Sequence, residues 1–226
     1  MNRNRMLWIL VIVLAIIGVV IVFRRVLFII PILQNGNSVS SNVIKNTSPI
    51  PDAGFAKHPL LTLIHILPGF LFMILGPLQF SKKIRFQRPN LHRWIGRVYL
   101  ACGLVIGISA LFMSFLMSIG GVNETVATTL FALFFLFGLI KAYIHIRKRQ
   151  ILLHREWMLR AFAIGLAVST TRPIVGIFVA TSGFTKLTVE EYFGTAFWLA
   201  FTLHLMIAEL WINHTRTRKG IDRLVQ

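Results

Sequence analysis

The chain contains very little cysteine and few acidic residues. Its one cysteine, Cys102, excludes disulfides, CxxC redox pairs and thiolate metal sites built within a single chain. Only 7 Asp and Glu residues accompany 24 Lys and Arg residues, so the formal net charge is +17. The sequence also lacks G-x-S-x-G, H-E-x-x-H and Walker A motifs, so no hydrolase or nucleotide-binding site is indicated.

The hydrophobic residues determine how the basic net charge is interpreted. They make up 56% of the 226 residues, and the mean hydropathy is +0.74. A soluble domain of this length does not need so much apolar surface. The basic residues gather in short blocks between apolar runs, which is typical of a polytopic membrane protein and not of a nucleic-acid-binding protein.

Six apolar stretches are long enough to cross the hydrocarbon core, which takes about 20 residues of helix. They cover approximately residues 6–30, 59–80, 94–118, 126–146, 157–180 and 193–213. The sequence therefore predicts an all-α polytopic membrane protein with six transmembrane helices. The first apolar run is too long for a signal peptide and has no cleavage site after it, so we expect a retained anchor helix.

Basic residues in the connections predict the orientation of the helices. Most of them lie before the first helix, in connections 81–93 and 147–155, and in the tail. The positive-inside rule therefore places both termini in the cytoplasm. The domain prediction is an anchor at residues 1–30, an extracytoplasmic loop at 31–58, a five-helix membrane core at 59–213 and a basic cytoplasmic tail at 214–226. The loop is rich in Ser, Asn, Pro and Gly, so we expect little regular structure there.

A short motif occurs twice in the chain, each time where a helix is expected to begin. Residues 90–100 read NLHRWIGRVYL, and residues 152–162 read LLHREWMLRAF. The repetition predicts that helices two to five form a four-helix bundle of two parallel hairpin repeats. Glu156 is one residue extra, and it rotates His154 by about 100° relative to the Trp-x-x-Arg phrase.

Ionisable residues inside apolar helices are costly, so each indicates a site or a buried pair. Counting about 1.5 Å per residue places one group at a single level near the cytoplasmic interface: Arg97, Lys141, Arg160 and Glu209. Just below it lies a second group: His92, His145, His154 and His214. This layer suits anionic lipid headgroups, a quinone or haem propionates. In the alternative interpretation the cations extend to headgroups and Lys141 pairs with Glu209.

The histidines indicate chemistry that a membrane interface does not require. Two neutral imidazoles on different helices can supply the axial ligands of a haem iron, so His92 and His154 are the candidate inner pair. His65 and His204 are the candidates for an outer haem, although this second pair breaks the repeat. Arginines pair well with propionates, and the candidates are Arg97, Arg160 and Arg172. Zinc at His145 and His154 is an alternative, but histidine alone rarely completes a four-ligand site.

Three segments resemble a known family. They are HPLLTLIHILPGFLFMILGPLQF, RPNLHRWIGRVYL and LLHREWMLRAFAIG. Over about residues 58–212 the chain resembles a family of bacterial multi-spanning membrane proteins, the domain of unknown function numbered 2306. The resemblance implies a bacterial inner-membrane protein and transfers no catalytic residue. A looser similarity, to cytochrome b561-type four-helix haem proteins, depends only on histidines near helix ends.

Three functions remain open at this point. The first is a b-type haem electron-transfer protein, a membrane oxidoreductase component that works with a quinone or another redox partner. The second is an anion or proton carrier in which His65, Arg172 and His204 line the path. The third is an accessory or scaffold subunit that binds anionic lipid. The absorption spectrum of the purified protein separates the first from the other two.

Overall fold

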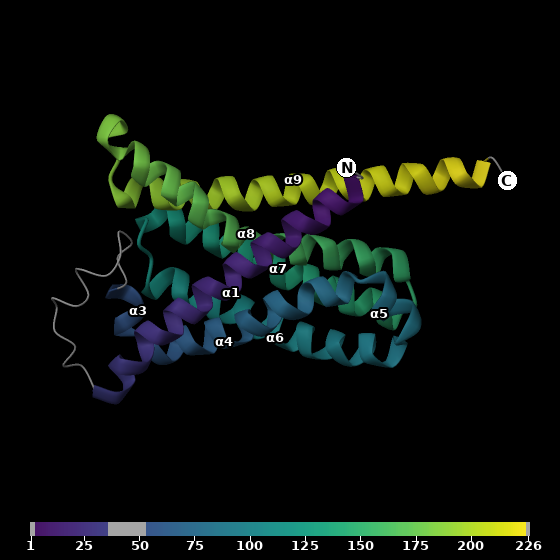
Figure 1. Ribbon diagram of the computed structural model, residues 1–226, viewed down its shortest axis with the longest axis horizontal. Coiled ribbons are helices and arrows are strands. Elements are labelled where there is room, and N and C mark those ends of the chain that lie inside the picture. The colour runs from purple at the N-terminus through teal and green to yellow at the C-terminus, as the bar shows by residue number, and fades with distance from the viewer. Residues whose placement is uncertain (1–2, 36–52, 225–226) are drawn as a thin grey trace.

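Six long helices lie side by side in the computed structural model, which describes residues 3–35 and 53–224 (Figure 1). They are α1 (Arg3–Asn35), α4 (Pro59–Phe80), α6 (Pro89–Leu116), α7 (Gly121–Arg147), α8 (Ile151–Thr185) and α9 (Val189–Leu224). Two short helices, α3 (Ala53–Lys57) and α5 (Lys82–Gln87), connect them. All six long helices are long and apolar enough to cross a membrane, so the predicted all-α fold with six spans is confirmed.

The helices extend past the apolar stretches. Pro59 and Pro89 stand in the first turns of α4 and α6, where a missing N–H and a fixed φ are tolerated. α1 continues to Asn35, α3 lies within the predicted loop, and α9 continues to Leu224 through the predicted tail. Hydropathy marks only the part of a helix that can lie in lipid, so it misses these polar turns. The remainder of the predicted loop, residues 36–52, lies outside the described residues.

Successive long helices pack against one another from α4 through α9, and α9 also packs against α7. The predicted anchor α1 lies across α4 and α8, as its diagonal path in Figure 1 shows. A Cβ placed on Gly18 of α1 would lie 2.8 Å from Ser169 Oγ of α8 and 3.2 Å from Met73 of α4. One side of α1 therefore packs on the bundle, while residues such as Val20 and Phe23 stay exposed.

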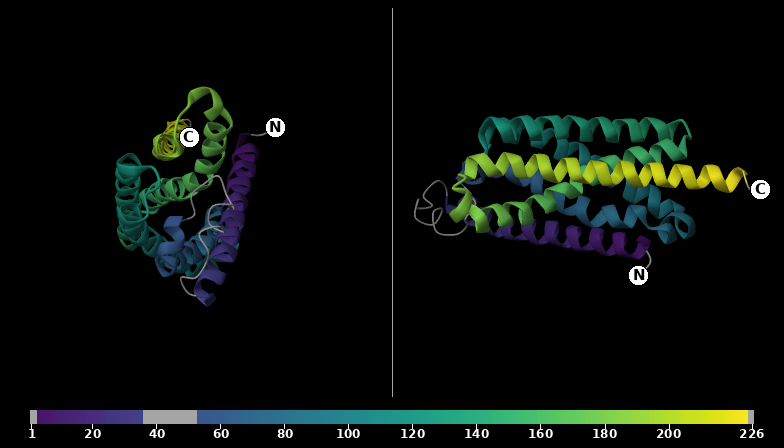
Figure 2. Two further views of the ribbon diagram at one scale, coloured as in Figure 1. Left: turned by 90° about the vertical axis from the view of Figure 1, so that its left-hand side faces the viewer. Right: turned by 90° about the horizontal axis from the view of Figure 1, so that it is seen from above.

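Aromatic rings fill the middle of the bundle. Phe72 of α4 stacks on Tyr99 of α6 with ring centroids 4.2 Å apart, and it contacts Phe135 of α7 at 5.7 Å and Phe162 of α8 at 6.4 Å. Because this centre is packed with side chains, polar groups at the two ends of the bundle form separate clusters. We call the end of the bundle at which α1 begins and α9 ends the terminal side and the opposite end the loop side (Figure 2).

Candidate functional site

The repeated motif places two partly buried histidines in the first turns of α6 and α8, on the terminal side. His154 Nδ1 donates a hydrogen bond to the carbonyl oxygen of Ala142 on α7, at 2.9 Å. In the neutral ring, Nε2 of His154 then carries the lone pair. His92 Nδ1 is buried and has no hydrogen-bond partner among the described residues. The two rings lie within electrostatic range of each other, so the structure brings this predicted pair into one cluster.

Gln79 near the end of α4 fixes the position of His92. Its Nε2 donates to the backbone oxygen of His92 at 2.9 Å, and Gln79 is buried. Gly96 makes room for this amide, since a Cβ at that position would lie 3.1 Å from Gln79 Nε2. The contact joins the end of α4 to the start of α6. The sequence signal for this contact was a lone glutamine in an otherwise apolar turn. Reasoning from charged residues alone missed the contact.

Two arginines, Arg85 and Arg155, lie near the two histidines. The charge of Arg85 on α5 acts on both His92 and Arg155, so the helix ends of α5, α6 and α8 converge here. Glu156 is an acid next to Arg155, but it forms an ion pair with Arg216 of α9, with Arg216 Nε 2.6 Å from Oε1. The extra residue of the second motif therefore binds α9 to α8. Arg85 and Arg155 leave the cluster with positive charge.

Arg160, which was predicted to lie near a propionate, binds a carboxylate of the protein. Its guanidinium makes two hydrogen bonds to Glu209 of α9, at 2.5 and 2.9 Å, and lies over the ring of Trp157 at 4.7 Å. Glu209 thus pairs with Arg160 and not, as the alternative interpretation had it, with Lys141. The ammonium of Lys141 lies 5.8 Å from the centroid of the Phe137 ring. Arg97 is exposed on the surface of α6.

The two histidines predicted for an outer site are bound within different helix pairs. His65 Nδ1 of α4 lies 2.9 Å from Ser109 Oγ of α6. The Ser109 hydroxyl donates to the Val105 carbonyl at 2.6 Å, so the imidazole N–H is the donor to Ser109. His204 Nε2 of α9 shares a 2.7 Å hydrogen bond with Thr170 Oγ1 of α8. A shared outer cofactor for these two rings stays a prediction.

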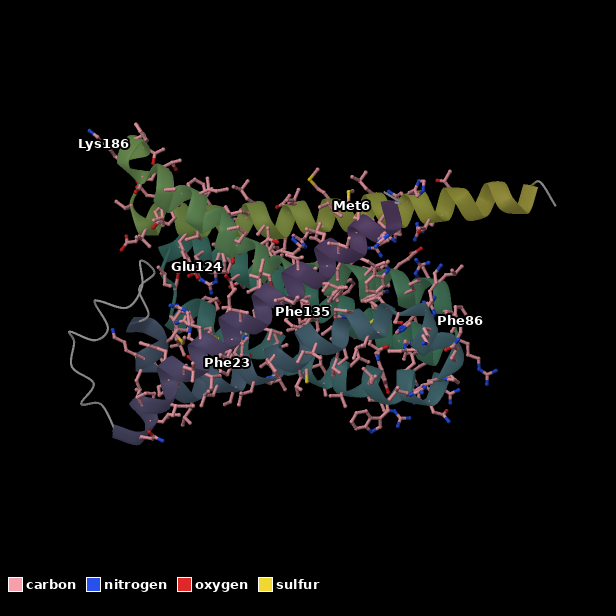
Figure 3. The ribbon with its side chains drawn as sticks, in the orientation of Figure 1. Met6, Phe23, Phe86, Glu124, Phe135 and Lys186 are labelled. Atoms are coloured by element: carbon pink, nitrogen blue, oxygen red, sulfur yellow. The ribbon has the colours of Figure 1, made fainter. Side chains whose placement is uncertain are left out.

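The loop side holds a buried carboxylate, Glu124 in the first turn of α7, just before the expected span 126–146 (Figure 3). Glu124 accepts hydrogen bonds from the backbone N–H groups of Ile119 and Gly120, each at 2.6 Å, and from Ser118 Oγ at 3.2 Å. The charge of Arg172 on α8 also acts on this carboxylate. Arg172, which was predicted to lie near propionates, therefore belongs to the cluster that closes the α6–α7 turn.

We expect Glu124→Gln to lower the free energy of unfolding by about 1–3 kcal/mol, because a neutral amide oxygen accepts these hydrogen bonds more weakly than a carboxylate and loses the attraction of Arg172. Glu190→Gln, an exposed substitution on the same side of the bundle, is the control and should change it by less than about 0.5 kcal/mol. Unfolding in detergent, followed by circular dichroism, measures both. Equal stabilities for the two variants would contradict the role given to Glu124.

Tyr99 places a polar atom in the centre of the bundle. Its side chain is 0% exposed, and its hydroxyl has no hydrogen-bond partner among the residues that the structure describes. Tyr99 lies two turns beyond His92 on the same face of α6, about 10 Å along the helix axis. A buried hydroxyl of this kind normally bonds to water or to a ligand. The inward face of α6 therefore carries two buried polar atoms, one from each residue, for which the described residues supply no partner.

The family model that describes a predicted membrane protein (DUF2306) matches residues 62–212, which is more than half of the chain. The chain belongs to the DUF2306 family. The match runs from α4 into α9, so it includes every candidate ligand and leaves out α1. No curated protein and no solved structure matches the chain.

The described part of this DUF2306 chain contains no metal site whose ligands all come from the protein. There, no group of three or more His, Cys, Asp or Glu residues is placed to hold a metal ion. His145, the other residue considered for zinc, has its Nδ1 2.6 Å from Gln150 Oε1. A porphyrin supplies four nitrogens itself, so an iron bound in haem requires only the two imidazoles.

Proposed function

We propose that this membrane protein binds a b-type haem between His92 and His154 and serves as an electron-transfer protein. The observation that carries the proposal is the position of the two imidazoles and the hydrogen bonding of their ring nitrogens. They come from different helices and lie within electrostatic range of each other. One ring is held through Nδ1, and the other has a buried nitrogen without a partner among the described residues. Bis-histidine ligation needs two such rings.

The hydrogen bond to Ala142 is the kind of support that histidine ligands use. An imidazole that donates one N–H to a backbone carbonyl keeps its tautomer and its ring orientation, and its second nitrogen becomes more basic. His154 meets this condition through the 2.9 Å bond from Nδ1. Gln79 supports His92 through the backbone: its amide donates to the His92 carbonyl oxygen and holds the first turn of α6 in place.

The charges around the pair favour the acidic side chains of a haem. Arg85 and Arg155 lie within electrostatic range of each other, and Arg85 also acts on His92. Arginine pairs well with carboxylates such as propionates. The two nearby protein carboxylates, Glu156 and Glu209, are already bound by Arg216 and Arg160. Arg160 therefore stabilises the α8–α9 contact in this proposal, and Arg85 and Arg155 are the residues that would hold the propionates.

Apolar side chains lie on the helices that carry the pair and on the end of α4. Phe80 and Phe162 contact each other with ring centroids 5.0 Å apart, and Met158, one turn after His154, is buried. A bound haem would supply one-electron chemistry, and a low-polarity wall helps to set its potential. The basic connections lie on the terminal side. The positive-inside rule then supports a cytoplasmic face for this site in a bacterial inner membrane, within reach of a quinone or a soluble redox partner.

The visible absorption spectrum tests the proposal. Protein purified in mild detergent, from cells supplied with a haem precursor, should show a Soret band and should develop sharp α and β bands on reduction by dithionite. We expect about one haem per chain. A colourless preparation of folded protein from the same cells would contradict haem binding, and the carrier and accessory-subunit functions would then be the ones to test.

A further inference from the structure

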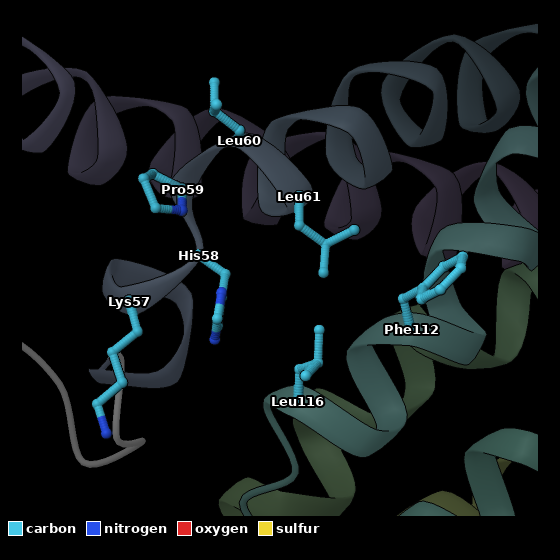
Figure 4. Close-up of a pocket in the computed structure, with 7 residues that line it drawn as sticks. All are labelled: Lys57, His58, Pro59, Leu60, Leu61, Phe112 and Leu116. Carbon is cyan, nitrogen blue, oxygen red and sulfur yellow. The ribbon is translucent and has the colours of Figure 1, made fainter.

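A pocket of about 520 Å³ opens on the loop side between the start of α4 and the end of α6. Figure 4 shows Leu61 of α4 facing Leu116 of α6 across it, with Phe112 beside them. Lys57 and His58, which precede α4, also line the pocket. Its inner part is therefore hydrocarbon, and its basic and imidazole groups lie at one end.

The pocket lies at the level where two transmembrane spans meet the membrane surface. α4 begins at Pro59, directly after the two polar lining residues, and α6 ends at Leu116. Phe112 and Leu116 are 59% and 55% exposed in the isolated chain, so the pocket is open to the surrounding lipid. Along the membrane normal, the apolar lining thus reaches acyl-chain depth while Lys57 stands at headgroup depth.

The start of α4 adds partial positive charge at the polar end. His58 makes no side-chain hydrogen bond that caps this helix, and Pro59 has no N–H. The backbone N–H of Thr62 bonds to the His58 carbonyl, which leaves the N–H groups of the preceding first-turn residues without an intrahelical acceptor. Free N–H groups and the helix dipole attract an anion to such a helix start. Lys57 adds a full positive charge beside it.

We propose that this pocket binds an anionic phospholipid from the leaflet on the loop side. The phosphodiester would lie at Lys57, His58 and the start of α4, and one acyl chain would lie between Leu61 and Leu116. A lipid with net negative charge fits better than a zwitterionic one, because a choline or ethanolamine group would bring a second cation next to Lys57. Inorganic phosphate would leave the apolar part of the pocket unfilled.

Native mass spectrometry of the whole protein tests this site. We expect protein released from detergent to retain phosphatidylglycerol roughly tenfold better than phosphatidylcholine of the same chain length. Contacts of Lys57 and His58 with the anionic headgroup would give a difference of about this size. In Lys57→Gln/His58→Gln this preference should fall to roughly twofold or less. Lys186→Gln, which removes an exposed lysine on the same side but outside the pocket, should keep the wild-type preference.

A second variant tests the apolar part separately. Leu116→Trp fills the space next to Leu61, so it should reduce retention of both lipids, while tryptophan at the interface keeps the helix end stable. Three results would overturn the proposal: equal retention of the two lipids by the wild type, an unchanged preference in the double variant, or unchanged retention in Leu116→Trp. Visible spectra of the same samples report on the His92–His154 site, so failure at one site is distinguishable from failure at the other.

Discussion

His92→Ala and His154→Ala should each reduce the haem content of the purified protein by roughly tenfold or more, because each removes one of two axial ligands. His145→Ala should leave the haem content near the wild-type value. His145 is the matched control, since it lies on the terminal side within electrostatic range of His154 but already bonds to Gln150. The comparison therefore separates ligation from a general loss of basic or aromatic groups.

Haem per chain, determined from the pyridine haemochrome and the protein concentration, measures this prediction. His92→Gln and His154→Gln should lose haem like the alanine variants while keeping more of the side-chain volume, which distinguishes a lost ligand from a cavity. Circular dichroism shows whether each variant is folded. Full haem content in either His92 variant or either His154 variant would mean that the residue is not a ligand.

Gly76→Ala should lower the free energy of unfolding by about 1–3 kcal/mol, because it overpacks the contact between α4 and α8. A Cβ on Gly76 would lie 2.3 Å from a ring carbon of Phe162, and a Cβ on Gly165 would lie 2.4 Å from a ring carbon of Phe72. Each helix therefore places a phenyl ring over a glycine of the other helix. Small residues allow such close approach between transmembrane helices.

Gly69 on the same helix supplies the control. A Cβ there meets nothing within 4 Å, so Gly69→Ala should leave stability unchanged or raise it by up to about 1 kcal/mol through helix propensity. Unfolding by sodium dodecyl sulfate in mixed micelles measures both variants. Gly76→Ala combined with Phe162→Leu should lose less stability than the sum of the single changes. Equal effects at Gly69 and Gly76 would contradict the proposed interlocking contact.

The six spans could be predicted because hydropathy and length alone determine which segments can cross the hydrocarbon core. Helix ends could not be predicted in this way. α9 continues to Leu224 through charged residues, and α8 continues to Thr185 beyond the predicted span. A helix can leave the membrane without breaking, so the end of an apolar run does not mark the end of a helix.

The levels of the polar residues along the helices were predictable, and their partners were not. Residue number gives the depth of a residue along its helix directly, so a common level for His92 and His154 could be predicted. Partners depend on the rotation of each helix and on which helices are neighbours. Glu209 pairs with Arg160 because α8 and α9 pack together along their length. Glu124 is buried because the α6–α7 turn directs its N–H groups at the carboxylate, which only the folded turn reveals.

Electron paramagnetic resonance of the oxidised wild-type protein tests the central claim most directly. Ferric haem with two imidazole ligands is low-spin. The spectrum should therefore show a low-spin signal from the haem iron ligated by His92 and His154, and little high-spin iron. The signal should be absent from His92→Ala. A purely high-spin spectrum, or an iron-free protein that is fully folded, would contradict bis-histidine ligation at the terminal side.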